Sequence, residues 1–253
     1  MSVQSQVHFV LSCQLPSGAF LLGKHDHRII PYFTHMALLS LLDAGEYEPV
    51  RRYLDWYLAH RGADGYVNDY IWRNGSEVDT GKADSEDSYH STFFTLVLAY
   101  QAAVNDFYWA RENCSQLQSI LTGLIALQQR NGLTWAKRSY KVAYLMDNCE
   151  TYLGLCAAEA LFTQIGDMTT ASTARERARW CAEGIMRMYD ERKQAFAVYD
   201  KRWPNWNKWY PDATSQAFPV LAGLAMAQES KSRQLYERFT YHFPRFDQFD
   251  TGD

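Results

Sequence analysis

The chain repeats one structural pattern four times. Each copy has a short turn, a few apolar or aromatic residues, a loop, and then a helix that opens with proline or aspartate. The turns are Ser17–Phe20, Asp64–Val67, Asn131–Trp135 and Lys193–Phe196. The helix starts are Pro31, Asp87, Asp147 and Pro211, which lie 56, 60 and 64 residues apart. Self-similarity at such a period indicates a fold assembled from copies of one supersecondary unit.

Two kinds of helix alternate within these units. Residues 50–58 carry apolar side chains on one face only, which is typical of a helix that covers a core. Residues 93–99 and 153–158 are apolar nearly all round, which predicts buried helices. Each unit is therefore expected to pair an outer helix with an inner one.

This pairing predicts an all-α fold. The expected architecture is an α/α toroid of repeated helical hairpins, closed or incomplete and open, formed by residues 1–253 as a single domain. Short β-hairpins are expected in the loops that follow Gly65 and Gly132. Pro219 predicts that the last inner helix is kinked or begins late, because proline breaks a helix interior.

Composition excludes several classes of function. The net charge is −4 and no dense Lys/Arg run is present, so no nucleic-acid partner is expected. No apolar run is long enough to span a membrane. The N-terminus lacks the features of a signal peptide, so a cytoplasmic protein is expected, or a secreted one if a leader has been removed. The five cysteines have no spacing typical of a disulfide framework or zinc site, and no motif for a cofactor is present.

Aromatic residues make up 15% of the chain, and many fall in the loops before the inner helices. Inner helices that run in the same direction bring these loops to one end of the fold. Flat aromatic faces beside polar groups suit sugar rings, although the same rings could simply seal the helix ends. The candidate binding residues at this end are Tyr32, Tyr89, Trp135, Lys137, Asp147, Trp209 and Tyr210.

Carboxylates collect at the same end of the inner helices. Cleavage of a glycosidic bond needs one protonated carboxyl and one carboxylate, and crowded acids separate the two pKa values. The catalytic candidates are Asp84, Asp87, Glu150 and Asp212. Helix capping is the commoner role for any single one of them. Acids on three inner helices nevertheless exceed what capping requires.

Other polar motifs carry weaker signals. His25, Asp26 and His27 have the residue types of a metal site, but an exposed loop is the favoured interpretation and no metal is expected. Lys137 could bind a carboxylated sugar or cover apolar surface with its stem.

Several stretches resemble bacterial members of the six-hairpin glycosidase-like superfamily, the α/α-toroid group. They run in order from about Leu15 to about Leu224 and include RIIPYFTHMALLSLL, ADSEDSYHSTFF, NGLTWAKRSYKVAYLMDNCETYLGL and KWYPDATSQAFPVLAGL. The resemblance implies a cleft at the inner-helix N-termini. Segment 83–89 resembles the place where cellulase-type toroids carry an essential aspartate, which puts Asp84 and Asp87 first and Glu150 and Asp212 as partners. Four clear units are present instead of six.

The leading hypothesis is a glycoside hydrolase that acts on an oligo- or polysaccharide without a cofactor. A carbohydrate-binding or polysaccharide-assembly protein on the same fold is the first alternative. A lyase or epimerase for uronic-acid sugars is the second, with Lys137 and Arg138 as candidate contacts for the sugar carboxylate. The sequence specifies neither the sugar nor an oligomeric state.

Overall fold

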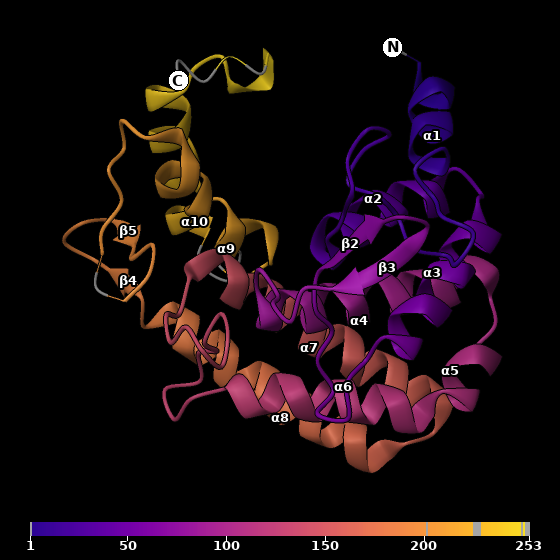
Figure 1. Cartoon of the computed structure of the whole chain (residues 1–253). Helices are drawn as coiled ribbons and strands as arrows, with labels where there is room; N and C mark the ends of the chain where they lie inside the picture. The colour runs from indigo at the N-terminus through magenta and orange to yellow at the C-terminus, as the bar shows by residue number, and fades with distance from the viewer. Residues whose placement is uncertain (1, 201, 225–228, 249, 251–253) are drawn as a thin grey trace.

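The computed structural model describes residues 2–200, 202–224, 229–248 and 250. Most of them are helical, and the strands are short (Figure 1). The longer helices are α1 (Val3–Leu11), α2 (Pro31–Asp43), α3 (Tyr47–Ala59), α4 (Glu86–Val104), α6 (Cys114–Leu127), α7 (Leu145–Ile165), α8 (Met168–Met186) and α10 (Glu229–His242). The short helices are α5 (Tyr108–Glu112), α9 (Phe218–Leu221) and the 3₁₀ turn η2 (Phe246–Gln248). Within the described residues, none of these helices has the length and apolar character needed to cross a lipid bilayer.

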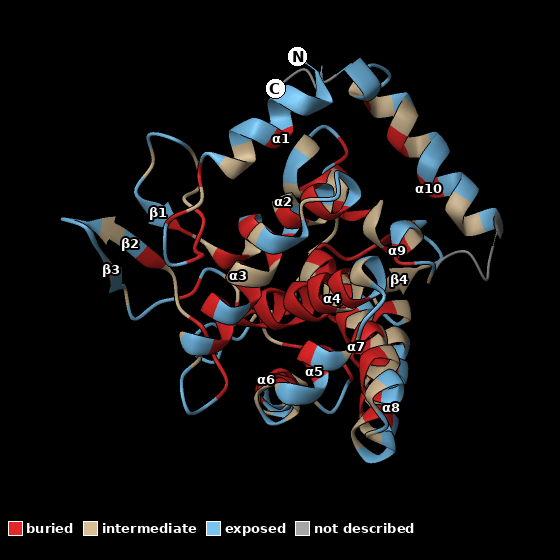
Figure 2. Ribbon diagram, turned by 90° about the vertical axis from the view of Figure 1, so that its right-hand side faces the viewer, coloured by how far each residue is buried: buried red, intermediate tan, exposed pale blue. Residues whose placement is uncertain are grey.

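Helices α2, α4 and α7 form the interior, and α3, α6 and α8 pack on their outer side. Figure 2 shows α4 and α7 buried along most of their length, whereas α8 and α10 keep exposed faces. The predicted alternation of inner and outer helices is therefore confirmed for the first three units. It follows from the apolar pattern, because only a helix that is apolar all round can be enclosed by its neighbours.

The glycine turns hold each unit to its outer helix. A Cβ at Gly65 would collide with the backbone carbonyl of Ser119 in α6, and one at Gly132 would collide with that of Trp180 in α8. Both glycines have positive φ, +90° and +88°. Gly18 lies in the same way against Arg52 in α3. The sequence repeat thus corresponds to one repeated contact between turn and helix.

The strands lie in the loops at the ends of the inner helices. Strands β1 (Arg28–Ile29), β2 (Tyr70–Arg73) and β3 (Ser76–Asp79) form an antiparallel sheet in that order. Strands β4 (Tyr189–Asp190) and β5 (Ala195–Phe196) form a second antiparallel pair. The hairpin expected after Gly65 is therefore present. After Gly132 there are only the isolated bridges Gln128–Thr134 and Lys137–Tyr140.

The fourth unit departs from the first three. Its inner segment begins with a π-helical turn, η1 (Trp209–Ala213), and is interrupted before α9 starts at Phe218. Pro219 lies in the first turn of α9, where proline costs no hydrogen bond. The interruption predicted from Pro219 is confirmed. As a result, a short, broken segment stands where the other units have a helix of three turns or more.

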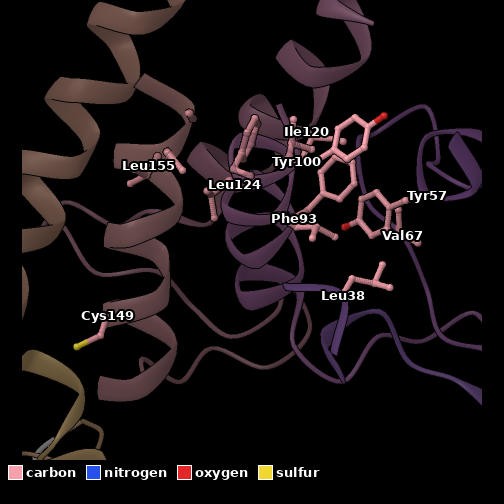
Figure 3. Packing of buried hydrophobic residues seen from close by; sticks show 14 of the residues in the cluster. Leu38, Tyr57, Val67, Phe93, Tyr100, Ile120, Leu124, Cys149 and Leu155 are labelled. Carbon is pink, nitrogen blue, oxygen red and sulfur yellow. The ribbon is translucent and has the colours of Figure 1, made fainter. Parts of the chain in front are cut away.

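The core lies between the inner and outer helices of the first three units. The rings of Tyr57 from α3 and Phe93 from α4 stack with centroids 4.0 Å apart, beside Leu38 of α2 (Figure 3). Ile120 and Leu124 of α6 continue this cluster. Because burial of large apolar side chains is the main driving force for folding, this cluster fixes the helices whose N-terminal ends form the site described below.

Candidate active site

The N-terminal ends of the inner helices line one cavity of about 1090 Å³. α2, α4, α7 and the η1–α9 segment each contribute to its wall, and α7 packs against both α4 and α9 (Figure 2). The helix starts that the repeat placed at one end thus share a single hollow. Its lining residues are Tyr32, Phe33, Asp84, Ser85, Ser88, Ala136, Lys137, Ser139, Tyr140, Tyr144, Met146, Asp147, Glu150, Tyr210, Pro211, Thr214 and Phe218.

Glu150 projects from the second turn of α7 into this cavity. The hydroxyl of Tyr32, from the start of α2, donates a hydrogen bond of 2.7 Å to its Oε1. Burial raises the pKa of the Glu150 carboxyl to about 7, against the opposing effect of the Tyr32 and Ser88 hydroxyls, and the nearby charge of Asp87 adds to the rise. A carboxyl with such a pKa is protonated in a large share of molecules near neutral pH, which is the state that a general acid needs.

Asp147 and Asp87 are joined by the hydroxyl of Ser85. Ser85 Oγ lies 2.8 Å from Asp87 Oδ1 and 3.2 Å from Asp147 Oδ2. A serine hydroxyl has one proton, so it can donate to only one of the two carboxyls. Burial, followed by the charges of Asp87 and Glu150, raises the pKa of Asp147 well above its usual value. A protonated Asp147 that donates to Ser85, which in turn donates to Asp87, satisfies both contacts.

Asp87 is fully buried behind the cavity and does not line it. It accepts hydrogen bonds from the backbone N–H of Ser88 (2.9 Å), from Thr134 Oγ1 (2.7 Å) and from Ser85. Burial raises its pKa to about 6 although these donors act in the opposite direction. None of the hydrogen bonds to Asp87 among the described residues comes from Arg or Lys, so its negative charge is not neutralised locally.

Asp84 is the exposed acid of the cavity. Its backbone N–H donates to the hydroxyl of Tyr89 (3.2 Å), and that hydroxyl donates to Asp69 Oδ1. Lys137 Nζ donates to the carbonyl of the preceding residue, Ala83 (3.0 Å). Tyr89 itself is 1% exposed, so it positions Asp84 from below and does not reach the cavity.

Tyrosines form the aromatic part of the wall. The rings of Tyr140 and Tyr144 lie 6.5 Å apart, with their hydroxyls 3.3 Å from each other. Tyr210 is 67% exposed and belongs to η1. Partial burial, followed by the charges of Asp147, Asp84 and Glu150, raises the pKa of Tyr210. The cavity therefore combines aromatic faces with carboxyls, as sugar-binding clefts do.

Besides Asp87 and Tyr89, three more of the candidates from the sequence lie outside the cavity. Asp212 is fully buried and accepts hydrogen bonds from Arg202 Nη2, 2.9 Å to each oxygen, and from the Asn205 backbone N–H (2.7 Å). Trp209 packs on Phe239 and Phe243 of α10, with centroids 5.3 and 5.2 Å away. Trp135 lies beside Lys141, whose Nζ is 4.7 Å from its ring centroid.

The histidine loop and Arg138 serve local contacts. Asp26 forms an ion pair with Arg28, and the described residues contain no group of three or more His, Cys, Asp or Glu side chains suited to a metal ion. Arg138 forms ion pairs with Glu86 and Asp64. Its guanidinium is therefore already engaged, and it does not line the cavity.

Sequence reasoning missed several residues of this site. Ser85 joins two of the acids, Asp69 anchors Tyr89, and Thr134 holds Asp87 from the turn that precedes α7. Thr134 follows the glycine of its repeat turn, the one regularity that could have marked it. Ser85 and Asp69 lie in loops that have no periodic pattern.

Comparison with known proteins supports the fold. No model of a protein family and no curated protein sequence matches the chain. Among solved structures, a rhamnosidase from Klebsiella oxytoca with rhamnose bound is similar, with a TM-score of 0.71 and 15% sequence identity. The match covers 94% of this chain and 47% of the rhamnosidase, so the chain spans about half the length of that protein. The chain thus has the fold of part of a glycoside hydrolase.

Proposed function

We propose that the chain is a glycoside hydrolase, folded as a single open α/α toroid, with its active site in the cavity at the inner-helix N-termini. The observation that carries the proposal is the position of Glu150. It lies in the cavity wall with a pKa raised to about 7 by burial, next to a second cavity acid, Asp147. The fold likeness to a rhamnosidase is consistent with a sugar substrate.

Glu150 is assigned as the general acid. Tyr32 occupies its Oε1 as a donor, which leaves the other carboxyl oxygen to hold the proton. In the reaction that proton passes to the glycosidic oxygen as the bond to the sugar breaks, and Glu150 is left as a carboxylate. Tyr32 then stabilises the new charge by its hydrogen bond, because such bonds to ionised acceptors are stronger than neutral ones.

Asp84 is assigned as the group that takes the proton from the attacking water. It is exposed to solvent at the mouth of the cavity, which gives water access to it. Tyr89 and Lys137 hold the backbone of residues 83 and 84 in place. A base of this kind needs a fixed position more than a buried one, since it has to align water with the sugar carbon.

The tyrosines and Lys137 are assigned to substrate binding. The exposed ring of Tyr210 and the Tyr140–Tyr144 pair offer faces for the C–H surface of a sugar. The hydroxyl of Tyr210 and the ammonium of Lys137 offer hydrogen bonds to its rim. Asp147 also lines the cavity and is assigned to binding a sugar hydroxyl, which donates to its second carboxyl oxygen while its proton is held toward Ser85.

The arrangement favours an enzyme over a sugar-binding protein without activity. Such a protein would use the acids as helix caps. The N-cap residues of α4 and α7, Ser85 and Tyr144, make no capping side-chain hydrogen bond, and Asp87, which accepts from the first-turn N–H of Ser88, lies behind the cavity. A carboxyl whose charged form is disfavoured by burial serves proton transfer better than passive binding. The uronic-acid lyase or epimerase has less support, since Arg138 is occupied by Glu86 and Asp64.

Release of reducing sugar from a panel of oligosaccharides, rhamnosides included, tests the proposal. The wild-type protein is expected to cleave at least one substrate, and Glu150→Gln to lower kcat about 10²–10⁴-fold, because it removes the transferable proton. The matched control is Glu159→Gln on the same helix, where the carboxylate pairs with Arg175 at the surface. This control is expected to retain full activity.

Two results would reject the assignment. Equal activity in the wild type and in Glu150→Gln would remove Glu150 from the mechanism. Sugar binding without any release across the panel, by protein whose thermal unfolding is normal, would instead support the binding protein. Asp84→Asn is expected to lower kcat as Glu150→Gln does. If this variant keeps its activity, Asp84 is not the group that activates water.

A further inference from the structure

A second cavity, of about 540 Å³, lies outside the candidate active site. We call it the basic pocket. Its wall is formed by the turn before β5, by the loop of residues 203–206, and by α10. The charged side chains that line it are Arg192, Lys193 and Arg238, and none of the described lining residues is acidic. Three positive groups thus meet in one hollow of a chain whose net charge is −4.

Two tryptophans form the apolar part of the basic pocket. Trp203 and Trp206 line it, and neither lines the larger cavity. Lys193 Nζ lies 4.8 Å from the centroid of the Trp203 ring, and the Arg238 guanidinium lies 4.5 Å from that of Trp206. Each cation thus lies over the face of a ring. Trp206 is 7% exposed and also stacks on His242, with centroids 5.7 Å apart, so the half-buried Trp203 is the ring that a ligand can reach. Trp203 and Trp206 therefore belong to this pocket, whereas Tyr210, further along the same segment, lines the larger cavity.

The third repeat unit provides an internal reference. A smaller cavity of about 410 Å³ lies at its turn, lined by Arg130, Trp180, Glu183 and Arg187 among others. Arg187 donates to the carbonyl of Asn131 (2.7 Å). In the basic pocket Arg238 donates in the same way to the carbonyl of Lys193 (2.9 Å). The arginine contact is thus a structural feature that both units have.

The basic pocket also has features that the third unit lacks, and the repeat does not explain these. The fourth unit has a second tryptophan, and it has Lys193 where the third has Asn131, whereas Arg192 corresponds to Arg130. None of its described lining residues is acidic, whereas the cavity of the third unit is lined by Glu183, which pairs with Arg179. Three positive charges in one hollow, with no acidic residue among its described lining, give a local positive potential that attracts an anion.

We propose that the basic pocket binds an anionic saccharide, a sugar that carries a carboxylate or a sulfate group. The half-buried ring of Trp203 takes the C–H surface of the sugar ring, and Arg192 and Lys193 pair with the negative group. Single-stranded nucleic acid also combines anions with stacking, but it needs a positive track along several nucleotides. Three cations in one hollow suit a single anionic group. This site is independent of the proposed hydrolysis, because it shares no lining residue with the larger cavity.

Titration calorimetry with trigalacturonate, a sulfated trisaccharide and neutral maltotriose tests the proposal. At least one anionic trisaccharide is expected to bind ten times or more tighter than maltotriose, with an affinity that falls as salt is added. The double variant Arg192→Gln/Lys193→Gln is expected to weaken that binding about tenfold, and Trp203→Ala to weaken it as well. The matched control is Arg130→Gln in the third unit, with unchanged affinity expected. Comparison of the two anions tells whether carboxylate or sulfate is preferred.

The readout is binding, so it does not depend on catalysis. Glu150→Gln is expected to bind the anionic trisaccharide as the wild type does, which separates the two proposals. The basic-pocket proposal is overturned if neither anion binds tighter than maltotriose, or if the double variant and Arg130→Gln have the same affinity as the wild type. Tighter binding of a thymidine oligonucleotide than of both anions would also overturn it.

Discussion

Two inner segments of the fold begin with a buried aspartate, and the two aspartates have opposite surroundings. Asp212, at the start of the fourth unit, accepts hydrogen bonds from the guanidinium of Arg202 and a backbone N–H. Asp87, at the start of α4, has only hydroxyls and a backbone N–H as partners. Both are fully buried. A buried charge is tolerated at low cost only when an opposite charge accompanies it.

The difference bears on why the proposed active site lies beside Asp87 and not beside Asp212. The charge of Asp212 is neutralised locally, and that residue organises the 202–205 loop. Burial is the main cause of the raised pKa values of Asp147 and Glu150 in the cavity wall, and the charge of Asp87, which is not neutralised, adds to both. One aspartate therefore stabilises structure, whereas the other contributes to the protonation of the groups proposed to react.

The largest expected effect concerns stability against pH. Because the folded pKa of Glu150 is about 7 and its ordinary value is 4.5, the folded state retains a proton that the unfolded chain has lost between these pH values. The stabilisation is fully present below about pH 4.5 and is lost as pH rises through about 7. Urea unfolding at about pH 5 and about pH 8 is expected to show wild-type stability falling by about 3 kcal/mol more than that of Glu150→Gln. Parallel pH dependences would contradict the assignment.

The next effect separates the two aspartates by stability. Asp212→Asn removes the charge that Arg202 pairs with, and we expect a loss of about 2 kcal/mol. Asp87→Asn removes a charge that has no cation, at the cost of one acceptor, and we expect a loss of about 1 kcal/mol. Urea unfolding at neutral pH measures both. The reverse order of the two losses would mean that Asp87 is the better compensated residue.

The smallest effect concerns the pH profile of activity. Asp87→Asn removes a negative charge that raises the pKa of Glu150, so that pKa should fall by about one unit. Because the proposed acid must be protonated, kcat/KM declines as pH rises through its pKa. The declining limb is therefore expected about one pH unit lower in Asp87→Asn and unchanged in Asp212→Asn. If the declining limb of the kcat/KM profile lies at the wild-type pH in both variants, Asp87 does not influence the pKa of Glu150.

Much of the fold could be predicted from the sequence, because the pattern of apolar residues along a helix indicates which of its faces are buried. The predicted starts at Pro31, Asp87 and Asp147 lie within two residues of the observed starts of α2, α4 and α7. The prediction for Pro211 was less accurate. A turn of π-helix stands there in place of a regular helix, and it depends on packing that periodicity does not record. The break that follows it was predicted from Pro219.

The site was predictable as a region and only partly as residues. Tyr32, Lys137 and Tyr210 line the cavity, as do the acids Asp84, Asp147 and Glu150. Asp87 and Asp212 do not, because each turns toward partners that lie behind the cavity. Spacing along a helix tells which turn a residue occupies. It does not tell whether a partner such as Thr134, 47 residues further along the chain, draws its side chain inward.

The most direct test of the account is the titration of the Glu150 carboxyl itself. Carbon-13 NMR of glutamate-labelled protein, with Glu150→Gln to identify the signal, measures its pKa without any knowledge of the substrate. The account predicts a midpoint of about 7 in the wild type. It also predicts a lower midpoint in Asp87→Asn and the wild-type value in Asp212→Asn. A wild-type midpoint near the ordinary value of 4.5 would contradict the central claim that buried, uncompensated acids keep Glu150 ready to donate a proton.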